Sequence, residues 1–148
     1  KKGVPHTLLS QIIPVIQDET NSVLSQLVGF VIKLDTDDRN INCYIQQPDG
    51  GEYPVELSSG MERFILSIAV RIGLINVSNL PRPNFIAIDE GFGVADSNTI
   101  MLMEILFNYL KTQFDFVLVI SHLMTIRDFV DHSLTITKSK QGYSEISV

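Results

Sequence analysis

The spacing of apolar residues predicts one long helix and a small group of strands in the first part of the chain. Apolar residues recur at helical spacing from Thr7 to Leu27, and Pro14 is expected to bend this helix or divide it. Alternating segments then predict strands at Val28 to Leu34 and Ile41 to Gln46, with a third at Tyr53 to Leu57. We expect these strands to form an antiparallel meander beside the main sheet.

A second helix is predicted from Leu57 to Ile75. Ser59 and Glu62 have the spacing of a capping box, which marks a helix N-terminus. The segment from Phe64 onward leaves almost no polar face, so we expect this helix to be buried within the domain.

Two continuous apolar runs, Phe85 to Ile88 and Phe116 to Ser121, flank a helix predicted from Ser97 to about Thr112. Short apolar runs of this kind are typical of strands buried on both faces, as in a parallel sheet. Strand, helix and strand in this order form a βαβ unit, so the two strands should be parallel. A short helix at Met124 to Val130 and a strand pair, Ser133 to Lys138 and Tyr143 to Val148, are expected to end the chain.

Polar residues follow both apolar runs directly. Asp89 and Glu90 end the first run, and His122 follows the second. The carboxyl ends of parallel strands meet at one edge of a sheet, where α/β proteins bind their ligands, so Glu90 and His122 should be neighbours. Two adjacent acids at such an edge indicate a bound cation or a proton-transfer task, because unpaired buried charge is costly.

Composition narrows the class of protein. The chain has 148 residues, which predicts one domain, 1–148, and a net charge of −6 from 11 basic and 17 acidic residues. That balance disfavours a self-sufficient nucleic-acid binder, although a partner could supply the basic surface. No apolar run is long enough for a membrane span. The single cysteine, Cys43, excludes an internal disulfide and is expected to be a buried structural thiol in a reducing compartment.

The order of these motifs resembles the C-terminal half of an ABC-type ATPase head. LSSGMERF resembles the signature motif of that family, FIAIDE its Walker B strand, Ala95-Asp96 the end of its D-loop, and His122 its switch histidine. DEGFGVAD is most similar to the SbcC-type double-strand-break repair ATPases, the bacterial counterparts of the Rad-fifty proteins. The resemblance implies an α/β fold with a largely parallel sheet flanked by helices.

The resemblance also implies roles for individual residues. Asp89 would hold Mg²⁺, Glu90 would polarise the attacking water, and His122 would contact the γ-phosphate. The signature turn, Ser58, Ser59 and Gly60, would bind ATP held by the opposite head, with Ser58 and Gly60 on its γ-phosphate. Asp96 would help to join the two half-sites.

This chain departs from the family pattern at three positions. Ser59 stands between serine and glycine where the family has glycine or another small residue, and Ala95 replaces a common leucine. Met61 stands where family members often carry glutamine or glutamate. A polar contact from position 61 is therefore not expected.

The sequence contains no GxxxxGK[ST] phosphate loop, and none of its nine glycines precedes a lysine. In the family that loop lies in an N-terminal lobe, beyond a long coiled coil. The chain starts at Lys1 rather than Met, so we expect a fragment, and the absence of the phosphate loop predicts that this fragment is the C-terminal lobe of a split head. Such a chain should not hydrolyse ATP by itself. The expected partners are its own N-terminal lobe, a second head in a homodimer, an SbcD-type nuclease and DNA through the assembled complex, at an intracellular, DNA-associated site.

Alternative functions remain open at the level of sequence. An SMC-type chromosome-organising head has the same chemistry with different partners. A non-catalytic interaction module would be free to lose Asp89, Glu90, Asp96 and His122, and all four are present. An ABC transporter domain usually carries both lobes in one compact chain, which this chain does not.

Overall fold

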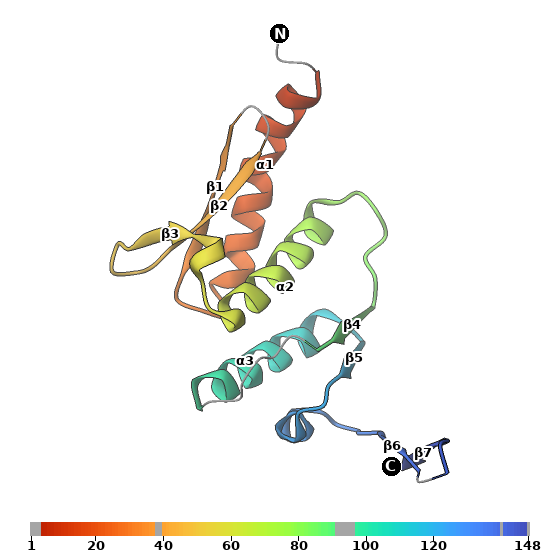
Figure 1. Ribbon diagram of the computed structural model, residues 1–148. Helices are drawn as coiled ribbons and strands as arrows, with labels where there is room; N and C mark the ends of the chain where they lie inside the picture. Colours follow the sequence, from red (N-terminus) through yellow and green to blue (C-terminus); the bar gives the residue numbers. More distant parts are fainter. Residues whose placement is uncertain (1–3, 38–39, 91–96, 140, 148) are drawn as a thin grey trace.

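The structure is a computed structural model that describes residues 4–37, 40–90, 97–139 and 141–147. Figure 1 shows helix α1 beside a small sheet, helix α2 crossing α1, and helix α3 next to a second sheet. The helices are α1 (Val4–Leu24), α2 (Gly60–Val77) and α3 (Ser97–Gln113), with 3₁₀ helices η1 (Val55–Leu57) and η2 (Met124–Phe129). The strands are β1 (Val31–Thr36), β2 (Ile41–Gln46), β3 (Glu52–Pro54), β4 (Phe85–Asp89), β5 (Phe116–Ile120), β6 (Thr135–Lys138) and β7 (Ser144–Ser147).

The predicted meander is present as an antiparallel sheet in the order β1-β2-β3. Its first strand begins three residues later than the sequence predicts, at Val31. The third strand is shorter than predicted, because the chain turns into η1 directly after Pro54. Proline has no N–H to donate to a ladder, so it ends a strand readily. Helix α1 runs through Pro14 without interruption, so this proline does not divide it.

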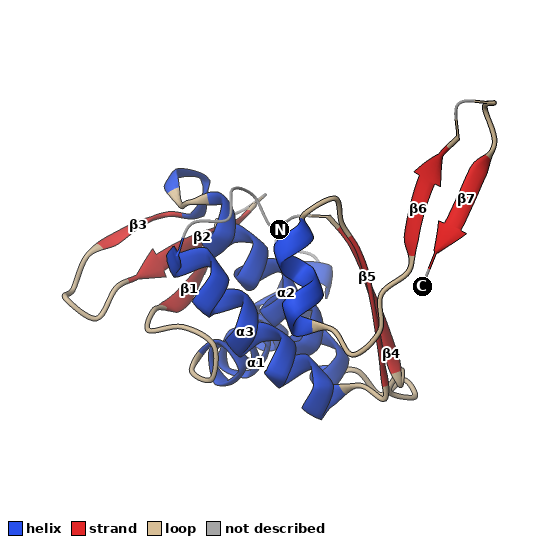
Figure 2. Cartoon of the chain, turned by 90° about the horizontal axis from the view of Figure 1, so that it is seen from below, coloured by secondary structure: helices blue, strands red, loops and turns tan. Residues whose placement is uncertain are grey.

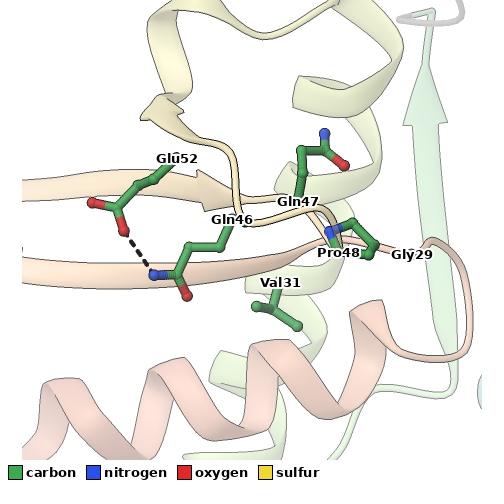
Figure 3. A pocket seen from close by; sticks show the side chains of 7 residues that line it. Gly29, Val31, Gln46, Gln47, Pro48 and Glu52 are labelled. Carbon is green, nitrogen blue, oxygen red and sulfur yellow. Dashed lines mark hydrogen bonds between the residues drawn. The ribbon is translucent and has the colours of Figure 1, made fainter.

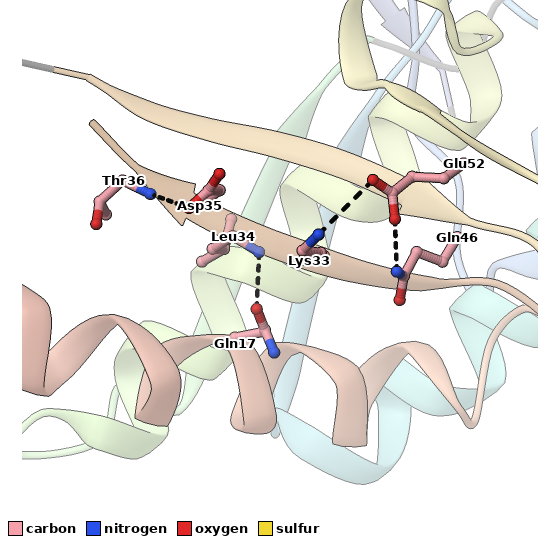
Figure 4. A network of polar contacts seen from close by, with 7 residues as sticks. All are labelled: Gln17, Lys33, Leu34, Asp35, Thr36, Gln46 and Glu52. Carbon is pink, nitrogen blue, oxygen red and sulfur yellow. Dashed lines mark hydrogen bonds and ion pairs between the residues drawn. The ribbon is translucent and has the colours of Figure 1, made fainter.

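Side chains of α1 close the free edge of β1. The Leu34 N–H donates to Oε1 of Gln17 at 2.7 Å, as Figure 4 shows. The Ile32 N–H donates to Oδ1 of Asn21 at 2.8 Å, and Nδ2 of Asn21 donates to the Ile32 carbonyl at 2.9 Å. Two side chains four residues apart on α1 therefore bond to two backbone groups that lie two residues apart on β1. These bonds satisfy backbone groups that an unprotected sheet edge would leave open.

Helices α1 and α2 cross at Thr20 and Gly73. Thr20 is fully buried, and its Oγ1 has no hydrogen-bond partner among the described residues. A Cβ atom placed on Gly73 would lie 3.0 Å from Thr20 Oγ1 and 3.1 Å from the Thr20 nitrogen. The close approach of the two helices therefore depends on the absence of a side chain at position 73.

Two substitutions at this crossing are expected to change the stability of the chain in opposite directions. Gly73→Ala should lower the free energy of unfolding by about 1–3 kcal/mol, because the new methyl group meets α1 backbone. Thr20→Val should raise the same free energy by about 1 kcal/mol, because it removes a buried hydroxyl without a partner. Urea denaturation of the chain measures both changes. Equal stability of wild type and Gly73→Ala would contradict the packing described here.

Helix α2 is buried on one face rather than on all sides. Its buried residues are Ile65, Leu66, Ile68, Ala69, Ile72 and Gly73. Arg63, Ser67 and Arg71 are exposed at intervals of four, so they form a polar stripe on the opposite face. The expectation of an almost fully buried helix is therefore correct for one face only.

The predicted βαβ unit is present. Strands β4 and β5 are parallel, with Phe85 opposite Phe116 and Asp89 opposite Ile120, and α3 connects them. One face packs on the core through Ile88, which is buried, and Val119, which is half-buried. The α/β fold class predicted from the sequence is confirmed, with the antiparallel meander near the N-terminus.

The expectation that both faces of this parallel sheet are buried is wrong for the described chain. Phe85 is 57% exposed and Phe116 is 60% exposed. We call this side the outer face; its residues are Phe85, Ala87, Phe116, Leu118 and Ile120. Phe85 lies opposite Phe116 and Ala87 lies opposite Leu118, so these residues make an apolar surface that ends at Ile120, whose register partner is the exposed Asp89. No described element of this chain covers that surface.

The chain ends in the predicted strand pair, an antiparallel hairpin of β6 and β7 that projects away from the helices (Figure 2). Ile136 and Ile146 lie opposite each other in its register and are both exposed. Among the described residues, no helix is long and apolar enough to cross a membrane.

Candidate functional site

Glu90 and His122 lie side by side, as the βαβ topology predicts. Nδ1 of His122 is 3.1 Å from Oε1 of Glu90. An ionised carboxylate only accepts hydrogen bonds, so the contact is a hydrogen bond in the ring forms that carry a proton on Nδ1. Both side chains are largely exposed, which leaves the pair open to a ligand.

The backbone of Glu90 explains why its side chain reaches His122. The Glu90 N–H donates to the Ile120 carbonyl at 2.8 Å, which extends the β4–β5 ladder by one bond. Its φ angle is 58°, in the left-handed region, which costs a residue other than glycine about 1–3 kcal/mol. The strand therefore ends in a constrained turn that directs the carboxylate toward the end of β5.

Asp89 is the last residue of β4 and is exposed. Within the described part of the chain, no three His, Cys, Asp or Glu side chains are grouped closely enough to hold a metal ion. Mg²⁺ commonly uses one or two carboxylates together with water and substrate phosphates. A single carboxylate at this position fits such a shared site and does not fit a metal site made by protein alone.

The signature turn, Ser58–Gly60, leads into α2. The Ser59 side chain accepts a hydrogen bond from the Glu62 N–H, and Glu62 Oε2 accepts one from the Ser59 N–H at 2.8 Å. This arrangement is the capping box predicted from the sequence. Ser58 is buried, and its hydroxyl donates to the Val55 carbonyl at 2.6 Å.

Glu62 is also joined to the meander. Its Oε1 accepts hydrogen bonds from the Tyr53 hydroxyl at 3.2 Å and from Nε2 of Gln47 at 3.4 Å. Partial burial raises the pKa of the Glu62 carboxyl, but the hydrogen bonds from Ser59, Tyr53 and Gln47 outweigh it and hold that pKa below its usual value. The sequence pattern identified the cap and missed Tyr53 and Gln47, for which no local signal exists.

The structure thus places the expected site residues in two groups. Glu90 and His122 are in contact and Asp89 adjoins them, whereas Ser58–Gly60 begins another helix. No hydrogen bond or ion pair among the described residues joins the two groups. Asp96 and the glycines of the predicted D-loop lie outside the described residues. Met61 is half-buried against the core, which agrees with its apolar character.

A cavity of about 410 Å³ lies at one end of the meander (Figure 3), and its lining includes none of the expected site residues. It is lined by Gly29, Val31, Gln46, Gln47, Pro48, Gly50 and Glu52. The Glu52 carboxylate accepts a hydrogen bond from Gln46 and lies 3.8 Å from Lys33. Among the described lining residues, the only carboxylate is therefore already partnered, and we do not take the cavity as a candidate catalytic site.

Two relatives match the chain by sequence. An uncharacterized protein of Acanthamoeba polyphaga mimivirus is 33% identical over 164 aligned positions, covering 97% of this chain and 12% of the relative. The C subunit of the nuclease SbcCD of Pseudomonas aeruginosa is 31% identical over 91 positions, covering 61% of this chain and 8% of the relative. The chain therefore spans only about an eighth or less of these proteins. No family model matches it.

Solved structures of SMC heads match most of the chain. A structure from a study of ATP-driven dimerization and DNA-stimulated activation of SMC ATPases superposes with a TM-score of 0.73 at 12% identity, covering 95% of this chain and 87% of that one. The chain has the fold of an SMC-related ATPase head. An Smc head from Pyrococcus furiosus, bound to the C-terminal domain of ScpA, gives 0.67 at 14% identity over 95% of this chain and 36% of that one. The resemblance stated from the sequence is confirmed at the level of the fold.

Proposed function

We propose that the chain is the C-terminal half of an ATPase head in an SbcC-type DNA-repair protein. The observation that carries the proposal is the contact between Glu90 and His122 at the carboxyl ends of two parallel strands. The SMC-head fold and the similarity to the C subunit of SbcCD support it. In such a head, ATP drives two heads together and hydrolysis separates them.

The chemistry assigned to the chain is proton transfer and charge stabilisation. The Glu90 carboxylate would orient the attacking water and accept its proton. With Nδ1 of His122 donating to Glu90 across their 3.1 Å contact, donation from Nε2 to a γ-phosphate oxygen would require a proton on both ring nitrogens. In that state the ring would hold the base in place and offset charge on the phosphate.

Asp89 would hold Mg²⁺ through water, because a hard cation prefers carboxylate oxygen. When bound, the ion would supply charge neutralisation for the phosphates. The exposed position of Asp89 beside Glu90 leaves space for the phosphates and water that complete its coordination.

The exposed outer face of the β4–β5 sheet is evidence that a second lobe covers it in the complete head. Parallel sheets are found almost only with both faces covered. The exposed aromatic and aliphatic side chains of the outer face would be buried by the N-terminal lobe that carries the phosphate loop. The same lobe would bring its lysine to the edge where Glu90 and His122 lie.

The signature turn would act on the nucleotide of the opposite head. Ser58, Ser59 and Gly60 begin α2, where free backbone N–H groups and the helix dipole favour a phosphate oxygen. The Ser58 hydroxyl is engaged by the Val55 carbonyl, so its donation to phosphate would require that bond to break. Asp96 would join the two half-sites.

The wider partners follow from the repair assignment. We propose an SbcD-type nuclease and DNA, bound through the assembled complex at an intracellular site. A chromosome-organising SMC head is the second candidate, since the structural matches are SMC heads. Co-purification with a nuclease subunit, as opposed to a ScpA-like subunit, distinguishes the two.

The test of the proposal is reconstitution of the head. The chain by itself should show no ATP hydrolysis above background, and a phosphate-loop lobe supplied in trans should restore it. Phe116→Asp should prevent restoration by placing a charge on the outer face, whereas Leu80→Asp, at an exposed loop position, should not. ATP turnover by the purified chain without the second lobe would refute the split-head assignment.

A further inference from the structure

Three side chains connect the meander with the first turn of α2; we call Gln47, Tyr53 and Glu62 the brace. Nε2 of Gln47 donates to the Tyr53 hydroxyl oxygen at 2.9 Å, and that hydroxyl donates to Oε1 of Glu62 at 3.2 Å. The other carboxylate oxygen of Glu62 accepts the Ser59 N–H at 2.8 Å. One carboxylate therefore holds the meander with one oxygen and the signature turn with the other.

The meander that carries Gln47 and Tyr53 is itself held in place by α1 and by the core. The meander is bound to α1 through Gln17 and Asn21, which accept and donate at the free edge of β1. On the sheet itself, Tyr53 of β3 pairs with Ile45 of β2, which is fully buried in the core. A bond from Tyr53 to Glu62 thus ties the signature turn to packed, hydrogen-bonded structure.

The brace fixes the position of the signature turn relative to the sheet, which the capping box by itself does not do. A capping box fixes the turn relative to its own helix, because both of its bonds join Ser59 and Glu62. The bonds from Gln47 and Tyr53 come from another element and fix the helix start relative to the sheet. Bonds to an ionised carboxylate are among the stronger hydrogen bonds in proteins.

We propose that the brace is a positioning device for the signature turn. Tyr53 and Gln47, acting through Glu62, set where the turn presents its backbone N–H groups and serines to the nucleotide of the opposite head. The inference rests on the proposed function, since the turn acts in trans only if two heads close around ATP. It assigns Tyr53 and Gln47 to head closure, a role that their sequence context does not suggest.

The test uses full-length protein carrying Glu90→Gln, so that ATP is not consumed during the measurement. Tyr53→Phe removes the brace hydroxyl and keeps both bonds of the capping box. We expect Tyr53→Phe to raise the ATP concentration needed for half-maximal head engagement by about three- to tenfold, because one hydrogen bond contributes a free energy of that size. FRET between labelled heads measures the engagement. A fluorescent ATP analogue, at protein concentrations too low for engagement, should bind with unchanged affinity.

Matched variants separate positioning from general stability. Tyr44→Phe, on β2 of the same sheet, removes a hydroxyl that makes no hydrogen bond with described residues and should engage as wild type does. Glu62→Gln keeps an acceptor for the Ser59 N–H and should lose less than Glu62→Ala, which removes both connections.

Two results for Tyr53→Phe would overturn the inference, and Ser58→Arg shows whether the proposed trans site fails with it. Engagement of Tyr53→Phe at the wild-type ATP concentration would overturn the inference. A parallel loss of ATP binding by unengaged heads would also overturn it, because that pattern indicates a structural role. If Ser58→Arg abolishes engagement and Tyr53→Phe has no effect, the role of the brace is rejected and the proposed trans site is kept. If Ser58→Arg also engages normally, both are rejected.

Discussion

Replacing Glu90 by Gln in the complete two-lobe head is expected to lower the rate of ATP hydrolysis by about 10²–10⁴-fold, the usual contribution of a general base. The amide keeps the size of the side chain and removes its ability to accept the proton of the attacking water. ATP binding and ATP-dependent head dimerisation should persist, because the phosphate loop and the signature turn are unchanged. A phosphate-release assay and sedimentation of the heads with ATP measure the two properties.

The control for this variant is Glu104→Gln, which makes the same chemical change at an exposed position of α3. It should hydrolyse ATP at the wild-type rate. Normal hydrolysis by Glu90→Gln would show that another group activates the water. Loss of dimerisation together with hydrolysis would place Glu90 in head closure instead of proton transfer.

Ser58→Arg is expected to abolish ATP-dependent dimerisation while the nucleotide still binds to each separate head. Ser58 is buried directly before α2, so the larger arginine side chain would have to extend to the surface, which in the proposed function faces the opposite head. The bulk would block the approach of the second head. Sedimentation with ATP should show monomers at concentrations about 100-fold above the wild-type dimerisation constant, a loss of ~2.7 kcal/mol.

Because Ser58 is buried, the folding of this variant must be checked. Ser67→Arg introduces the same charge on the exposed stripe of the same helix and should dimerise normally. Retained ATP binding by Ser58→Arg shows that its head is folded. Dimerisation of a folded Ser58→Arg head at the wild-type ATP concentration would remove the signature turn from the trans site.

Local patterns in the sequence determined much of the fold. Two apolar runs around a helix were enough to predict parallel strands, and hence the contact of Glu90 with His122, because a βαβ crossover brings both carboxyl ends to one edge. The Ser59–Glu62 capping box followed from a spacing of three residues, and both of its bonds are present. Such features depend on neighbours within one turn or on the direction of adjacent strands. The roles assigned to these residues in ATP hydrolysis stay predictions.

The errors of the sequence interpretation also have local causes. The apolar run at Phe85 predicted burial on both faces, but hydrophobicity specifies only that a surface avoids water and not which polypeptide covers it. The third strand ended early because Pro54 and η1 intervene, although the residues beyond Pro54 are compatible with a strand. The sequence made no prediction for the direction of the Ser58 hydroxyl, which donates to the Val55 carbonyl of the preceding 3₁₀ turn.

Tertiary structure alone decided which distant residues meet. Tyr53 and Gln47 reach Glu62 only because the β2–β3 register and the packing of α2 place them there. Gly73 is required where α2 crosses Thr20, and neither residue carries a local signal of that contact. The sequence by itself thus determined the elements and the edge where Asp89, Glu90 and His122 gather. The packing of those elements decided how the signature turn is held, because contacts between distant segments depend on register and crossing geometry rather than on local periodicity.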